Sequence, residues 1–261
     1  EQQCDGTNKN LAGNARSLAY LFGGATCNQA VEPYYPKNTI LQTADYNGVT
    51  HYYYNGTRDK SDSLTKNKAN AVDYDKDKDE FILRHYTEAN YTSDPNNQGS
   101  SFPYSSSFFP FNSTLTTSSF NQYGNKEILN EEVDYWFGMR MDVNFIQNAN
   151  GQMTQSDGVT KEPMIFNFTG DDDVWVFIDD VLVLDIGGTH SAVKGSIDFS
   201  TGEIRTEIIE GAKFSYETNL YKQFEEKAKT EPNGGWKTTD DGKKIFADYT
   251  SHKMSFFYLE R

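Results

Sequence analysis

The most constraining feature of the sequence is a nine-residue run, Phe137–Phe145, in which apolar residues alternate strictly with polar residues or glycine. Successive side chains of a β-strand point to opposite faces, whereas an α-helix repeats about every 3.6 residues. The run therefore predicts a strand with one buried face and one exposed face. Met164, Phe166 and Phe168 repeat the alternation and predict a second half-buried strand.

A third segment, Val174–Ile178, is apolar at every position. Such a run is typical of a central strand that is covered on both faces. Asp179 and Asp180 follow it, and Val181–Asp185 is again rich in apolar residues. Because Asp is favoured in tight turns, the whole segment predicts a β-hairpin.

Strands are expected to outnumber helices in the rest of the chain. Five more are expected at residues 51–54, 81–86, 195–199, 203–208 and 253–259. Two helices are expected, one over residues 10–22 and one that carries Leu220, Phe224 and Ala228 on one face. Aromatic residues make up 15% of the chain, which also favours strands. We therefore predict an all-β fold, a β-sandwich with long decorated loops and two or so peripheral helices.

No linker rich in Pro, Gly or Ser divides the chain, which favours one domain over residues 1–261. Within it we expect an N-terminal helical extension over residues 1–30, loop-rich insertions over residues 31–130 and the core over residues 131–261.

The chain has 24 Lys and Arg residues against 38 Asp and Glu, a formal net charge of −14. This charge repels nucleic-acid backbones and anionic membranes, so we expect neither as a partner. No apolar run reaches the roughly 18 residues of a spanning helix, and Glu1–Cys4 lacks the basic and apolar regions of a signal peptide.

Cys4 and Cys27 are the two cysteines of the chain, and their spacing fits no zinc or iron–sulfur site. A disulfide between them would close a loop worth about 3 kcal/mol and would fit an oxidising, extracellular setting. Two free thiols are the alternative, and the sequence leaves both open.

An acidic segment that begins at Asp73 starts like an EF-hand loop. The pattern then fails, because Lys78 stands where the turn needs Gly and Arg84 stands where calcium needs a bidentate carboxylate. We interpret the segment as a solvated turn before the strand at residues 81–86.

A second acidic cluster, Asp171, Asp172 and Asp173, lies between two predicted strands. Adjacent side chains of an extended chain diverge, so neighbouring carboxylates do not normally hold one ion. A cis peptide bond between Asp171 and Asp172 would make them converge at a cost of about 3–4 kcal/mol, and a bound calcium ion could offset that cost. The alternative is a solvated acidic turn.

Gly187, Gly188 and His190 follow the return strand of the hairpin. The glycine pair permits backbone shapes that other residues avoid, and His190 could donate a hydrogen bond or pack as an ordinary loop residue. The sequence contains no nucleophile elbow, phosphate loop or paired zinc histidines, and carboxylate pairs suited to glycoside hydrolysis arise by chance among 38 acids. We expect no enzyme activity.

The stretch from Phe166 to His190, including the Asp171–Asp173 run and the Gly187-Gly188-Thr-His190 loop, closely resembles the fibro-slime branch of the anthrax protective antigen lectin-like domain family. Further segments that resemble the family extend over most of the chain, at residues 20–23, 108–112, 135–139 and 256–261. These segments look like matching segments in large surface proteins of Gram-positive gut bacteria.

The resemblance implies a β-sandwich in an extracellular, cell-wall-anchored or pilus-borne surface adhesin. Lectin members of the family hold Ca²⁺ with two adjacent aspartates joined by a cis peptide, which here fall on Asp171 and Asp172. The expected ligand-binding residues are these two together with Asp173, Gly187, Gly188 and His190. The toxin branch of the family has the same fold but binds no sugar. The chain stops where the family leads us to expect one more strand, so we also expect strand pairing with another chain at the C-terminal edge.

Two functions remain in view. The first is a calcium-dependent adhesin module that binds host or dietary glycans or glycoproteins, with aromatic loop residues stacking on sugar rings. The candidate aromatic residues are Tyr52, Tyr53, Tyr54, Phe102, Tyr104 and Trp236. The second is a structural or protein-binding tip domain of a pilus or surface fibre, in which calcium only makes loops rigid.

Overall fold

The computed structural model of the chain contains two compact units. The described residues of the smaller unit are 34–55, 69–86, 108, 110 and 111, and those of the larger unit are 137–188, 190–209 and 215–260. The predicted helix over residues 10–22 and the cysteines Cys4 and Cys27 lie outside the described residues. The expectation of one domain over residues 1–261 stays a prediction.

Two antiparallel hairpins form the described strands of the smaller unit. In the first, β1 (Gln42–Tyr46) pairs with β2 (Val49–Tyr53). In the second, β3 (Ala69–Asp75) pairs with β4 (Glu80–Tyr86). The strands predicted at residues 51–54 and 81–86 are thereby confirmed.

The acidic segment between β3 and β4 is a turn. Asp75 Oδ1 accepts hydrogen bonds from the backbone N–H groups of Asp77 and Lys78, at 3.1 and 3.2 Å, and Lys78 Nζ lies 2.5 Å from Asp75 Oδ2. The Tyr74 hydroxyl donates to Asp79 Oδ1 at 2.9 Å. The turn uses its own carboxylates to hold its shape, as the interpretation as a solvated turn requires.

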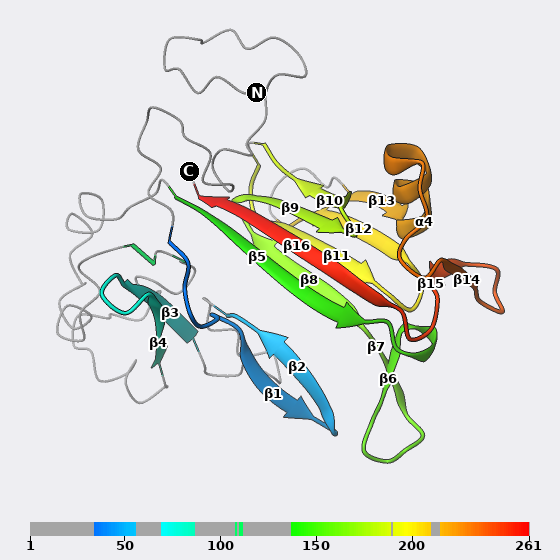
Figure 1. Ribbon diagram of the computed structural model, residues 1–261, viewed down its shortest axis with the longest axis horizontal. Helices are drawn as coiled ribbons and strands as arrows, with labels where there is room; N and C mark the ends of the chain where they lie inside the picture. Colours follow the sequence, from blue (N-terminus) through cyan, green and yellow to red (C-terminus); the bar gives the residue numbers. More distant parts are fainter. Residues whose placement is uncertain are drawn as a thin grey trace, which may run out of the picture. The chain divides into compact units, whose positions relative to one another are not determined.

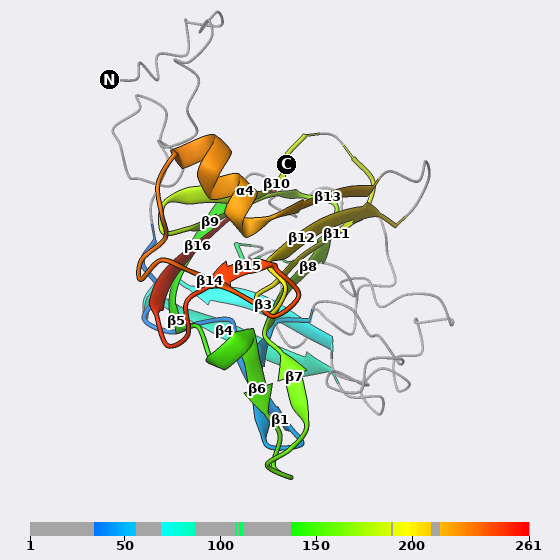
Figure 2. The ribbon, with the colours of Figure 1, turned by 90° about the vertical axis from the view of Figure 1, so that its right-hand side faces the viewer.

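Two four-stranded antiparallel sheets form the larger unit. The first has the order β10-β9-β16-β5 and contains β5 (Phe137–Ile146), β9 (Asp173–Ile178), β10 (Val181–Ile186) and β16 (Ser251–Glu260). The second has the order β13-β12-β11-β8 and contains β8 (Ile165–Gly170), β11 (Val193–Asp198), β12 (Glu203–Ile208) and β13 (Ser215–Asn219). Figures 1 and 2 show the two sheets stacked face to face.

The core lies between these sheets. The ring of Phe256 on β16 packs against the rings of Phe166 and Phe168 on β8, with centroids 6.1 and 6.0 Å apart. Val176 of β9 and Ile197 of β11 are both fully buried. The alternation seen in the sequence thus directs one face of each sheet inward, and the predicted all-β sandwich is confirmed.

The C-terminal strand corrects one expectation. β16 pairs with β9 on one side and with β5 on the other, so that Met254 lies opposite both Ile178 and Val143. Both of its flanks are occupied by strands of this chain, and the prediction that residues 253–259 leave a neighbour open for another chain is wrong. The central position satisfies the backbone hydrogen bonds along both edges of β16.

Asp179 fixes the predicted hairpin between β9 and β10. Asp179 and Asp180 have φ angles of 47° and 64°, as a tight left-handed turn requires. The Asp179 carboxylate accepts hydrogen bonds from buried His252 Nδ1 at 2.7 Å, from the backbone N–H of Lys253 at 3.0 Å and from that of Asn233 at 3.1 Å. One turn residue therefore ties the hairpin to β16 and to the loop before β14.

The predicted helix near Leu220 is also present. It begins as α4 (Leu220–Gln223), continues as a π-helical turn, η3 (Phe224–Ala228), and ends at Lys229. The Asn219 side chain caps its N-terminus by accepting from Lys222 N at 2.9 Å. In the part of the chain that the structure describes, no helix is long and apolar enough to cross a membrane.

Five short elements also belong to the larger unit. The 3₁₀ turn η2 (Ala149–Gly151) leads into a hairpin of β6 (Gln152–Thr154) and β7 (Lys161–Pro163). A second hairpin pairs β14 (Trp236–Thr238) with β15 (Lys244–Phe246). The sequence patterns did not predict these elements, because three-residue strands are too short to show a period.

Gly151 and Gly158 give a matched test of this packing. Both have left-handed φ angles, 62° and 75°, but a Cβ at Gly151 would lie 2.2 Å from the backbone oxygen of Phe199, whereas a Cβ at Gly158 would meet nothing within 4 Å. We expect Gly158→Ala to cost about 1–2 kcal/mol from strain alone, and Gly151→Ala to cost at least about 2 kcal/mol more. Urea unfolding of both variants measures the difference, and equal losses would contradict this packing.

Candidate functional site

The residues predicted to bind a ligand gather at one end of the sandwich. There β8 ends at Gly170, β9 begins at Asp173 and β10 leads into Gly187. β16 ends at Glu260, and its Leu259 lies opposite Asp173. Figure 1 shows the end of β16 beside the start of β5 at this edge.

The three aspartates point into different surroundings. Asp171 is exposed, Asp172 is half-buried and Asp173 is 4% exposed. None of the peptide bonds among the described residues is cis, so the predicted cis bond between Asp171 and Asp172 is wrong. Asp171 and Asp172 form a bend between β8 and β9.

Asp173 holds the glycine loop. Its Oδ1 accepts a hydrogen bond from the backbone N–H of Gly188 at 2.7 Å, and Gly188 has a φ of 112°, which favours glycine. A Cβ on Gly187 would lie 2.9 Å from the Trp175 ring. His190 faces the backbone oxygens of Ser191 and Ile186, at 3.0 and 3.4 Å. The structure therefore brings Asp173 and Gly188 together, while the His190 ring contacts the backbone of neighbouring residues.

A residue that the sequence did not single out, Glu260, completes the acidic cluster. The Tyr258 hydroxyl oxygen lies 2.5 Å from Asp172 Oδ2 and 2.5 Å from Glu260 Oε2. Tyr258 and Glu260 are only 6% and 8% exposed. A phenol carries one proton and can donate to one carboxylate at a time. The second carboxylate therefore needs either a proton of its own or a cation.

The pKa values of the two carboxyl groups agree with the need for a second proton. Burial, together with repulsion by Asp172 and Asp171, raises the pKa of Glu260 to about 8 despite the hydrogen bond from Tyr258. Burial raises the pKa of Asp172 as well, and the negative charges of Asp171 and Asp173 add to it, against the hydrogen bonds from Tyr258 and Glu260. The cluster binds a proton more tightly than an ordinary carboxylate does.

The two carboxylates suit a hard cation, because carboxylate oxygens are among the ligands that calcium prefers. Within the described residues, however, no three His, Cys, Asp or Glu side chains are placed so that they could hold one metal ion. A cation between Asp172 and Glu260 would therefore need backbone carbonyls, water or ligand hydroxyls to complete the six to eight oxygens of calcium.

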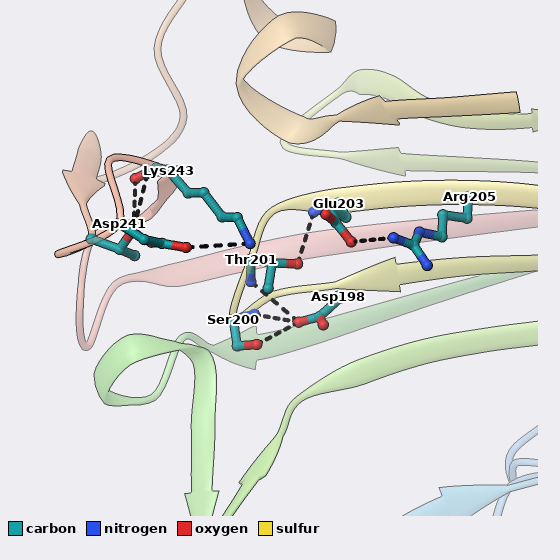
Figure 3. Close-up of polar contacts among 8 residues, drawn as sticks. Asp198, Ser200, Thr201, Glu203, Arg205, Asp241 and Lys243 are labelled. Carbon is teal, nitrogen blue, oxygen red and sulfur yellow. Dashed lines mark hydrogen bonds and ion pairs between the residues drawn. The ribbon is translucent and has the colours of Figure 1, made fainter.

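A second candidate site is a polar groove of about 430 Å³ at the opposite end of the β13-β12-β11-β8 sheet. It is lined by Thr201, Glu203, Ile204, Arg205, Glu217, Thr218, Asn219, Tyr221, Gly242, Lys243 and Lys244. Figure 3 shows Lys243 reaching from the β14–β15 turn toward Thr201. Its volume is in the range of small-molecule sites.

The groove presents fixed charges of both signs beside one aromatic ring. Arg205 Nη2 lies 2.9 Å from Glu203 Oε2, and Lys243 Nζ lies 3.3 Å from Asp241 Oδ2 (Figure 3). Lys244 Nζ lies 5.9 Å from the centre of the Tyr221 ring. Such a surface offers donors and acceptors to a neutral polar ligand without a net field that selects one sign of charge.

The aromatic residues expected to stack on sugars have different surroundings. Tyr52 is 70% exposed, whereas Tyr53 and Tyr54 are half-buried and the ring of Tyr54 packs 5.5 Å from that of Phe108. Trp236 stacks on Phe246 at 5.4 Å and belongs to the packing under α4. Phe102 and Tyr104 lie outside the described residues.

The acidic cluster predicts an unusual dependence of stability on pH. The folded-state pKa of Glu260 is about 8 against an ordinary value of 4.5, so the folded protein binds the proton more tightly. The free energy of unfolding should therefore fall as pH rises from about 4.5 to about 8, by at most about 1.4 kcal/mol per pH unit. Glu260→Gln keeps the side-chain shape without the titration and should flatten the profile. Urea unfolding between pH 4 and pH 9 in the absence of calcium measures it, and parallel profiles would contradict the assignment.

Comparison with known proteins finds short matches to curated proteins. No family model matches the chain, and no solved structure matches it. Protein psiF of Dictyostelium discoideum is 64% identical over 36 residues, which are 14% of this chain and 5% of that protein. Protein psiP of the same organism is 47% identical over 55 residues, 21% of this chain and 7% of that protein. The chain thus spans between 5% and 7% of the length of these relatives, and its resemblance to the fibro-slime family stays a prediction.

Proposed function

We propose that the chain is a calcium-dependent adhesin module of an extracellular surface protein that binds glycans or glycoproteins. The observation that carries the proposal is the Tyr258 hydroxyl placed 2.5 Å from both Asp172 and Glu260. Asp172 and Glu260 repel each other when both are ionised, and a divalent cation between them would supply the positive charge that offsets this repulsion.

The fold explains what such a cation would do. Asp172 belongs to the connection between β8 and β9, and Glu260 is the last residue of β16. A cation on both side chains would fasten this connection to the central strand. The connection between β10 and β11 is already attached to β9 by the hydrogen bond from Gly188 N–H to Asp173. Calcium would then stabilise the whole loop end of the sandwich.

Glycan binding follows from the free positions on the cation. Protein side chains supply few of the oxygens that calcium needs here, so hydroxyl groups of a sugar could occupy the rest. Exposed Asp171 lies beside the cluster and could accept hydrogen bonds from the same sugar.

One observation favours the rival function, a structural or protein-binding tip domain. Tyr258 and Glu260 are 6% and 8% exposed, so a cation held chiefly by them would lie beneath the surface and beyond the reach of a sugar. Calcium would then only make the loops rigid.

Calcium binding is tested first by stability. At 1,000 times its dissociation constant an ion that binds only the folded state stabilises it by about 4.1 kcal/mol, so the melting temperature should rise by roughly 2–4 °C for each kcal/mol. We expect Asp172→Asn and Glu260→Gln to abolish this rise. Asp180→Asn removes an exposed carboxylate from a turn in which Asn is tolerated, and it should respond as wild type does. Calorimetric titration with calcium that shows equal affinity in all four proteins would refute the site.

Glycan binding is tested separately, with a glycan array read with calcium and with chelator. Hits that disappear with chelator and in Asp172→Asn support the adhesin. Calcium-dependent stability without any hits supports the structural tip domain. Hits that survive chelator but disappear in Arg205→Ala would move the sugar site to the polar groove.

A further inference from the structure

One lysine in the larger unit touches both an amide and a carboxylate. Lys237 Nζ donates to Asn150 Oδ1 at 2.7 Å and lies 2.5 Å from Asp248 Oδ2. Asp248 Oδ1 accepts from the backbone N–H of Asn150 at 2.8 Å. The three residues come from β14, from η2 and from the connection between β15 and β16. Figures 1 and 2 both show the short helix η2 beside the β14–β15 hairpin.

We propose that Lys237 and Asn150 form an intramolecular isopeptide bond, with Asp248 as the group that moves the proton. An amine, a carboxamide and a carboxylic acid are the three groups that this condensation requires. The proposal concerns the stability of the chain and is independent of calcium and of glycan binding.

The step balances without any other reactant. Asp248 takes a proton from the Lys237 ammonium, and the neutral Nζ attacks Asn150 Cγ. The Nζ–Cγ bond forms and the Cγ–Nδ2 bond breaks. Asp248 returns its proton to the departing nitrogen, which leaves as ammonia. The ammonia then takes up the second proton that Nζ loses and becomes ammonium. No atom is oxidised or reduced, and Asp248 ends ionised as it began.

The geometry places the nucleophile close to its target. Nζ is 2.7 Å from Asn150 Oδ1, and Cγ lies one carbonyl bond, about 1.2 Å, beyond that oxygen. Asp248 holds both partners at once, Lys237 through Oδ2 and the Asn150 backbone through Oδ1. Because both reactants are fixed on one folded chain, their effective concentration is far above that of a bimolecular reaction.

The proton starts on the lysine. Burial raises the pKa of Asp248, but the hydrogen bonds from Lys237 and from the Asn150 backbone, together with the positive charge of Lys237, outweigh it and hold that pKa below its ordinary value. The resting state is thus an ion pair, and the reaction begins with transfer of one proton across a 2.5 Å hydrogen bond. The side chains of Lys237 and Asp248 are 32% and 25% exposed, so both are partly shielded from water.

The structure restrains a competing reaction that is common at Asn-Gly sequences. In that reaction the backbone nitrogen of the residue after Asn attacks the Asn side chain. Here Gly151 N donates to Asn148 O at 2.8 Å, and Gly151 itself is buried against Phe199. Asn150 has a φ of 56°, and in this turn its side chain reaches Lys237. The local structure therefore leaves the Asn150 amide available to the lysine.

The bond would join residues 87 positions apart, tying the start of the β6–β7 hairpin to β14. A closed loop of this length limits the unfolded chain and so raises the stability of the folded one.

The test is the intact mass of the folded full chain, measured under denaturing conditions with cysteines reduced. We expect a mass lower than that of the sequence by one ammonia molecule, and a protease digest in which the Asn150 and Lys237 peptides remain joined. Lys237→Arg, Asn150→Ala and Asp248→Asn should each show the full sequence mass. Lys243→Arg is the matched control, because Lys243 pairs with Asp241 alone, and it should keep the mass loss.

Two results would overturn the proposal. One is an unchanged mass in wild-type protein that circular dichroism shows to be folded. The other is a mass gain at Asn150, which would mean hydrolysis of its amide to aspartate. If Lys237→Arg does not fold, the wild-type mass and digest still decide the question. If a bond forms, the variants that lack it should also melt at lower temperature than Lys243→Arg.

Discussion

The pairing of β16 between β9 and β5 is the constraint on which the larger unit depends. This strand supplies Phe256 to the core and His252 to the Asp179 turn. Its last residues place Tyr258 and Glu260 beside Asp172. A central strand with both edges satisfied is costly to displace, because each unpaired buried backbone group loses a hydrogen bond. The two ends of β16 therefore fix both the hairpin turn and the acidic cluster.

Polar groups buried at the edges of this core are held by shared hydrogen bonds, and they differ in how fully they are satisfied. Asp179 accepts from three donors and is balanced. Asp172 and Glu260 share one hydroxyl, and burial raises the pKa of both. A carboxylate with all its hydrogen bonds made has a structural role. A buried carboxylate with too few hydrogen bonds binds a proton or a cation more tightly, so it can respond to pH or to a metal ion.

The fold followed from the sequence wherever the pattern was long. Three patterns each predicted an element that the structure contains. They are the alternation of Phe137–Phe145, the apolar run at Val174–Ile178 and the helical spacing of Leu220 and Phe224. Patterns report the face of an element and not its neighbours. The open neighbour expected beside the C-terminal strand came from the family resemblance, and the structure instead closes both sides of that strand.

The sequence by itself determined which local chemistry is present: a run of three aspartates, a glycine pair and a tight Asp-Asp turn. Only the tertiary structure decided which of those groups meet. Asp172 is 86 positions from Tyr258, and Asn150 is 87 positions from Lys237. The contacts that join them arise from strand register, which backbone hydrogen bonds and core packing set across the whole sandwich. No local pattern carries that information, because a side chain's partner depends on the fold that brings the two segments together.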